Sequence, residues 1–131
     1  RSQFDRGADV VYAAAGGTGI GVYQAAADSG KLAIGVDSNQ NYLHPGTMLT
    51  SMLKRVDVAA YKAFMDAKDG KFTTGFQVLG VAEGGIDWAL DEHNKALITD
   101  AMKAAVEKAK AGIVDGSIKV HDYMADNSCP M

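Results

Sequence analysis

Cysteine, proline and long apolar runs are scarce in this sequence of 131 residues. Cys129 is the one cysteine, so the chain can form no internal disulfide. A lack of disulfides suits the cytosol and is also compatible with secretion. Only two prolines are present, which excludes collagen-like and Pro-rich material. No apolar run approaches the ~20 residues that a membrane-spanning helix needs. The formal net charge is only −3, which argues against a nucleic-acid partner because phosphate binding requires a basic surface.

The composition is that of a globular domain that needs neither a metal nor a disulfide to fold. Apolar residues make up 47% of the chain and charged residues 22%. A domain of this size can bury roughly two-thirds of its extended-chain surface. His44, His93 and His121 have no metal-ligand spacing, and the nucleophile motif G-x-S-x-G does not occur. The sequence therefore predicts no metal, no cofactor and no catalytic residue.

Apolar runs of strand length alternate with helical patterns along the chain. We expect strands at 10–15, 31–36, 47–53, 76–81 and 118–124, and helices at 20–29, 58–68 and 99–115. This alternation predicts a layered α/β fold around a parallel sheet with right-handed crossovers. The run at 10–15 is typical of a strand buried on both faces. Five aromatic residues are expected in the core: Phe4, Tyr12, Phe64, Phe76 and Trp88. One or two of them, Trp88 first, could instead border a base or a sugar.

Small residues follow the first expected strand, at 16–21. A glycine-rich turn lets backbone N–H groups approach an anion or a hydroxyl group. This turn departs from G-x-G-x-x-G, since Val22 stands where the third glycine belongs, and it lacks the Lys and Ser/Thr of a P-loop. Both a simple strand–helix turn and a ligand-binding turn containing Gly17 and Thr18 fit this pattern.

Charged residues follow the next two expected strands. Asp37 follows the strand at 31–36, where its two oxygens could each accept one O–H of a ribose diol, or where it could cap the following turn. Lys54 follows the strand at 47–53, where it could donate to a sugar oxygen or a ring nitrogen, or be solvated. The carboxyl ends of parallel strands meet at one sheet edge. Gly17, Thr18, Asp37 and Lys54 are therefore predicted to line one binding site.

Three blocks of sequence carry a resemblance to a known family. The series GADVVYAAAGGTGIGVYQAA, LAIGVDSNQ and MLTSMLKRVDVAAY resembles, in order and spacing, the C-terminal portion of basic-membrane-protein-type (purine nucleoside receptor A-like) solute-binding proteins. The resemblance implies a type I periplasmic-binding-protein fold, in which two α/β lobes close on a nucleoside or purine. It also implies that Asp37 holds the ribose hydroxyls, that Lys54 reaches the ligand from the hinge side, and that Gly17 and Thr18 line the pocket.

By the same resemblance, residues 1–131 are the C-terminal portion of a longer bilobed protein. The opening residues 1–7, which read as the end of a helix without an initiator methionine, also indicate a fragment. Residues 47–75 would form a hinge crossing and a first-lobe helix, with 47–54 a crossing segment instead of a simple sheet strand. Most of the remainder would belong to the second lobe. Either the missing N-terminal half or a second copy of the chain would then complete the fold.

The function that the resemblance implies is non-enzymatic. Such a protein would deliver a purine nucleoside or a purine base to the permease of an ABC importer. It would be periplasmic or at the cell surface, anchored to the membrane by a lipid near the N-terminus of the longer protein. The residues themselves leave two alternatives open. One is the cofactor-binding half of an α/β oxidoreductase, and the other is a ligand-sensing regulatory domain on the same fold.

Overall fold

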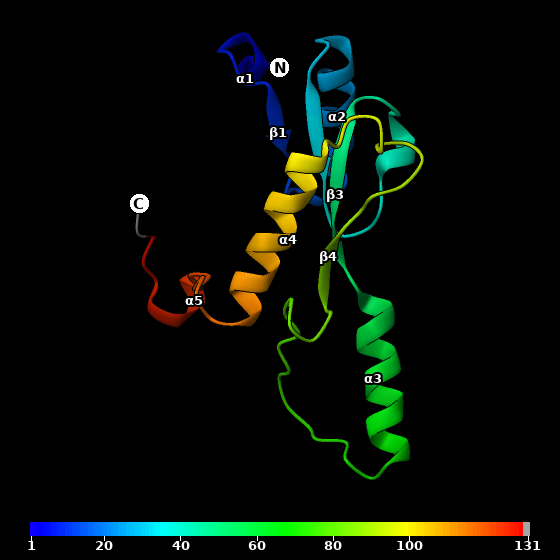
Figure 1. Ribbon diagram of the computed structural model, residues 1–131, viewed down its shortest axis with the longest axis vertical. Helices are drawn as coiled ribbons and strands as arrows, with labels where there is room; N and C mark the ends of the chain where they lie inside the picture. Colours follow the sequence, from blue (N-terminus) through cyan, green and yellow to red (C-terminus); the bar gives the residue numbers. More distant parts are fainter. Residues whose placement is uncertain (130–131) are drawn as a thin grey trace.

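The computed structural model describes residues 1–129, and Figure 1 shows a layered α/β body from which one helix and a long loop extend. Short 3-10 turns lie at Gly16–Thr18 and at Asn41–Leu43. The helices and strands, in chain order, are α1 (Ser2–Asp5), β1 (Val10–Tyr12), α2 (Gly19–Asp28), β2 (Leu32–Gly35), β3 (Met48–Lys54), α3 (Val56–Lys68), β4 (Ile86–Trp88), α4 (Asp100–Val114) and α5 (Tyr123–Asp126).

The four strands form one sheet in the order β1-β2-β3-β4. β1, β2 and β3 are parallel, which confirms the predicted parallel α/β sheet, whereas β4 pairs antiparallel with β3. β3 is thus a full member of the sheet, with β2 on one side and β4 on the other. The chain leaves the sheet after Lys54 and enters α3, so the implied crossing at 47–54 stays a prediction.

The buried core lies between α2 and the sheet. It contains Tyr23 and Ala26 of α2, Ala33 of β2 and Met48 of β3, each fully buried. Gly19 lets the first turn of α2 pack closely here, because a Cβ at this position would lie 2.8 Å from the Tyr23 hydroxyl. Side chains alternate between the two faces of each strand, so the neighbours of these buried residues point toward the opposite face.

α4 lies against the opposite face of the sheet, where its Met102 and Val106 share a cavity with Ile34 of β2; Figure 1 shows this helix beside β3 and β4. Thr99 caps this helix by accepting a hydrogen bond from the Met102 N–H at 3.2 Å, as expected for a threonine before an apolar-periodic segment. The packing here is loose. A cavity of about 320 Å³ lies between Ile34, Trp88 and Val106, among other side chains, so Trp88 is half-buried in this layer.

α3 and the segment 71–85 extend away from this body (Figure 1). The predicted helix at 58–68 is confirmed and begins two residues earlier, at Val56. None of its residues is buried, and the ring of Phe64 is 76% exposed. Phe76 in the following segment is fully exposed. Placing these two aromatic residues in the core is therefore wrong, because no other described element lies against this part of the chain.

Three predicted strands differ from the structure for a shared reason: a strand needs a neighbour to bond. Residues 76–81 form no strand, and Glu83 instead accepts a hydrogen bond from the Gly80 N–H at 2.8 Å in a turn. Residues 118–124 form no strand, and Asp122 instead caps the helical turn of α5. β1 ends at Tyr12 rather than at 15 and is half exposed, since no described strand pairs with its outer edge.

Candidate ligand-binding site

A cavity of about 380 Å³ lies at the carboxyl ends of β1 and β2, at the edge where the sequence predicts a site. The turn after β1 forms one wall, and the segment between β2 and β3 forms the other. The lining residues are Gly16, Gly17, Ile20, Val36, Asp37, Ser38, Gln40, Tyr42 and Leu43. Gly17 and Asp37 are thus brought together on one cavity, as expected from their positions at neighbouring strand ends.

Thr18 and Lys54 lie beside this cavity without lining it. Thr18 is exposed at the end of the 3-10 turn that also contains Gly17. Lys54 reaches the site through Asp37: its Nζ lies 2.7 Å from Asp37 Oδ1, and its backbone N–H donates to the Asp37 carbonyl at 2.8 Å. All four predicted residues therefore lie at one edge of the sheet, and two of them contact the cavity directly.

The Asp37–Lys54 pair sets the electrostatics of the site. The hydrogen bond from Lys54 to Asp37, reinforced by their charge attraction, raises the pKa of the lysine above its ordinary value. Asp37 has a φ of +72°, a left-handed conformation that Asp, Asn and Gly adopt more readily than other residues. An ionised carboxylate has about four lone-pair sites. Asp37 can therefore accept hydrogen bonds from a ligand while it stays paired with Lys54.

The alternative role of Asp37 as a turn cap is filled by another residue. Asn39 accepts the hydrogen bond from the Asn41 N–H at 3.0 Å, and the Ser38 N–H bonds to the Val36 carbonyl at 2.9 Å. The Asp37 side chain is thus left on the cavity wall.

Two tyrosines lie at this edge: Tyr42, which the sequence did not single out, and Tyr12, which was expected in the core. Tyr42 lines the cavity and is 60% exposed, and Tyr12 at the end of β1 is 49% exposed instead of lying in the core. Tyr12 lies inside the expected strand at 10–15, and aromatic residues in apolar runs more often pack inside. Tyr42 lies in the loop that follows the expected strand at 31–36, which offered only a weak signal. The Tyr42 ring is placed where it can contact a flat ligand, whereas Tyr12 is not among the residues that line this cavity.

A buried hydrogen-bonded cluster also escaped prediction. Asn41, Ser51 and Asn94 are fully buried. The Ser51 hydroxyl donates to Asn41 Oδ1 at 2.8 Å and accepts from the Gln40 N–H at 3.1 Å. Gly35 makes room for this hydroxyl, since a Cβ there would lie 2.6 Å from it. Buried polar groups such as these must find partners within the protein, so the cluster ties the cavity segment to β3.

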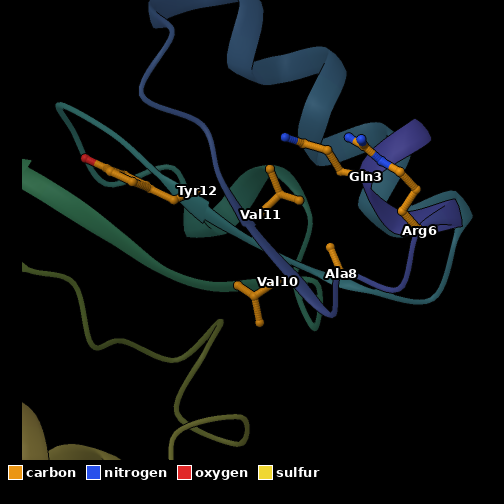
Figure 2. A pocket seen from close by; sticks show the side chains of 6 residues that line it. All are labelled: Gln3, Arg6, Ala8, Val10, Val11 and Tyr12. Carbon is orange, nitrogen blue, oxygen red and sulfur yellow. The ribbon is translucent and has the colours of Figure 1, made fainter. Parts of the chain in front are cut away.

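A second hollow, of about 370 Å³, lies along the free edge of β1 and is shown in Figure 2. The Asp9 carbonyl and the Ala13 N–H bond to β2, so the backbone groups of Val10 and Tyr12 face away from the sheet. In Figure 2, Gln3 and Arg6 lie on the α1 side, whereas Tyr12 points away from them. The polar groups do not converge, so this hollow is the unpaired edge of the sheet rather than a ligand site.

Residues 1–129 contain neither a metal site nor a membrane-spanning helix. This part of the chain has no group of three or more His, Cys, Asp or Glu side chains that could hold a metal ion. None of its helices combines the length and the apolar character needed to cross a membrane.

Comparison with known proteins places the chain in a family. The family described as "ABC transporter substrate-binding protein PnrA-like" matches residues 1–122. The ABC transporter nucleoside-binding protein BmpA of Lactococcus lactis is 35% identical over 91% of the chain and 38% of its own length. An uncharacterized lipoprotein of Pyrococcus furiosus is 39% identical over 66% of the chain and 23% of its own length.

Solved structures agree with this assignment. The crystal structure of an ABC transporter solute-binding protein from Aeropyrum pernix K1 superposes with a TM-score of 0.75 and 27% identity, covering 92% of this chain and 42% of that one. The chain spans between 34 and 38% of the length of the first curated relatives that it matches. It belongs to the PnrA-like, or basic membrane protein, family of ABC transporter substrate-binding proteins, and has the fold of one part of such a protein.

Proposed function

We propose that the full-length protein binds a purine nucleoside or purine base without chemical turnover and presents it to the permease of an ABC importer. The observation that carries the proposal is the Asp37 carboxylate on the wall of the cavity after β2, paired with Lys54. A carboxylate with free lone pairs suits the vicinal hydroxyls of a ribose. The nucleoside-binding relative from Lactococcus lactis supports the choice of ligand.

The proposal includes the surroundings of the protein. A receptor for an importer works on the outer side of the cytoplasmic membrane, so we place it in the periplasm or at the cell surface, held by a lipid near the N-terminus of the longer protein. The lipoprotein from Pyrococcus furiosus supports this anchor.

We also propose that the N-terminal half of the longer protein covers α3 and the segment 71–85. This region exposes large apolar side chains, including Phe64 and Phe76, and exposed apolar patches of this kind mark contact surfaces. The division of the chain into a second lobe and a crossing with a first-lobe helix follows from the same proposal. Both walls of the cavity belong to the proposed second lobe. The first lobe would enclose the ligand on the side that these walls leave uncovered.

Isothermal titration of the full-length protein with inosine, guanosine, adenosine and the free bases tests the proposal. Asp37→Gly removes the carboxylate and keeps the φ of +72° free of strain. Two charge-assisted hydrogen bonds contribute about 1.5–3 kcal/mol each, so nucleoside binding should weaken by ~2–4 kcal/mol, roughly 30-fold or more. Binding of a free base should change much less.

Asp9→Ala is the matched control, because Asp9 is an exposed carboxylate paired with Lys31 at 2.6 Å and lies outside the cavity lining. The Asp9→Ala variant should bind nucleosides with the affinity of the wild type. Equal losses for nucleoside and base in Asp37→Gly would contradict the ribose contact. Chromatography of recovered ligand completes the test, since released base would show that the protein is an enzyme. Failure to bind any purine compound would refute the ligand class.

A further inference from the structure

The segment 36–43 forms most of one wall of the cavity, yet it belongs to neither the sheet nor an α-helix. It contributes the Asp37 carboxylate and the Tyr42 ring. Its backbone hydrogen bonds at Ser38 and Leu43 are made within the segment itself. Local turns of this kind shape a loop, but they do not define its position relative to the sheet. Contacts from outside the segment must do so.

Asp91, which follows β4, provides such a contact. Its Oδ2 accepts hydrogen bonds from Asn39 Nδ2 at 2.6 Å and from Asn41 Nδ2 at 3.0 Å, across 52 and 50 residues of sequence. Asn39 and Asn41 are also joined to each other, by the Asn41 N–H at 3.0 Å from Asn39 Oδ1. One carboxylate oxygen therefore holds two side chains of the cavity segment, and hydrogen bonds to an ionised acceptor are stronger than neutral ones.

Asp91 is itself fixed in place. Its other oxygen accepts from the His93 N–H at 2.8 Å, and its own N–H donates to Asn94 Oδ1 at 2.8 Å. Asn94 is fully buried and bonds backbone carbonyls of β3 and of the residue after β4. Partial burial acts to raise the pKa of Asp91, but the hydrogen bonds from Asn39, the His93 N–H and Asn41 outweigh it and lower the pKa. The carboxylate is therefore charged when it holds the loop.

We infer that Asp91 is a positioning residue of the ligand site, which holds the segment 36–43 in its binding arrangement without lining the cavity. The inference rests on the proposed function for the ligand, and on the hydrogen bonds above for the mechanism. Affinity falls in proportion to the fraction of molecules that are competent to bind. If the segment kept this arrangement one-tenth of the time, apparent affinity would fall about tenfold.

Hydrogen exchange of the ligand-free, full-length protein tests the loop-ordering step directly. In Asp91→Ala, the amides of residues 39–43 should exchange at least about tenfold faster. Asp91→Asn should be intermediate, because an amide has one acceptor oxygen in place of two. The control is Asp115→Ala, since Asp115 accepts a comparable bond from the Ser117 N–H at 2.9 Å but lies after α4. Unchanged exchange in Asp91→Ala and Asp91→Asn would overturn the inference.

Titration of the same variants with inosine tests the consequence. Binding should weaken about tenfold in Asp91→Ala and less in Asp91→Asn, and should stay unchanged in Asp115→Ala. Wild-type affinity despite faster exchange would overturn the inference, as would lost affinity with unchanged exchange. If Asp91→Ala does not fold, the exchange rates and the affinity of Asp91→Asn test the inference in its place. If the wild type does not bind inosine, the proposed ligand fails, while the exchange rates still decide whether Asp91 orders the segment.

Discussion

Replacing Asn94 by alanine should be among the most destabilising single changes in the sheet region. Its side chain makes three hydrogen bonds: Nδ2 donates to the carbonyls of Leu49 and Ala89, both at 2.9 Å, and Oδ1 accepts from the Asp91 N–H at 2.8 Å. Each contributes about 1 kcal/mol net, and a buried group left without a partner costs more. The Thr50 hydroxyl still bonds the Ala89 carbonyl at 2.7 Å, which limits the loss. We expect a decrease of about 2–4 kcal/mol in the free energy of unfolding.

Urea unfolding of the full-length protein, followed by circular dichroism, measures this decrease as a shift of the midpoint. Gln24→Ala is the control, because Gln24 is an exposed amide with one bond to Asp28, and its effect should stay within about 0.5 kcal/mol. Asn94→Asp keeps the acceptor but loses the donors, so at neutral pH it should be at least as unstable as the alanine variant. An alanine variant within 0.5 kcal/mol of wild type, or an aspartate variant more stable than alanine, would refute the reasoning.

Three further changes test other parts of the structure. Gly35→Ala should destabilise the protein by about 1–3 kcal/mol, since its Cβ would lie 2.6 Å from the Ser51 hydroxyl, and adding Ser51→Ala should recover part of the loss in thermal unfolding. Partial burial acts to raise the pKa of Asp87, but hydrogen bonds, led by that from Lys110, lower it below 3.8. The ionised Asp87 therefore stabilises the fold above about pH 4, and this contribution is lost as the pH falls. In acid unfolding, the difference in stability between the wild type and Asp87→Asn should shrink as the pH is lowered. Phe64→Ser should reduce self-association of the 131-residue chain in light scattering. The same change should destabilise the full-length protein, where the proposed first lobe covers this ring. A full-length variant as stable as the wild type would contradict that cover.

Local patterns in the sequence were sufficient for the elements that lie within a continuous α/β unit. The apolar runs before Gly16 and Asp37 form β1 and β2, and the helices between and after them begin within a few residues of their predicted starts. Polar residues at the ends of parallel strands must share one sheet edge. For that reason Gly17, Asp37 and Lys54 could be assigned to one region from the sequence alone, although their contacts could not.

Tertiary structure decided what depends on partners distant in sequence. The segments at 76–81 and 118–124 have strand-like composition, but a strand forms only where a neighbour supplies hydrogen bonds, and the place beside β3 is taken by the short antiparallel β4. The bonds of Asp91 to Asn39 and Asn41 span 50 residues or more, and neither spacing nor periodicity signals them. Local propensity therefore predicts elements, whereas pairing, burial and the buried polar cluster follow only once the chain has folded back on itself.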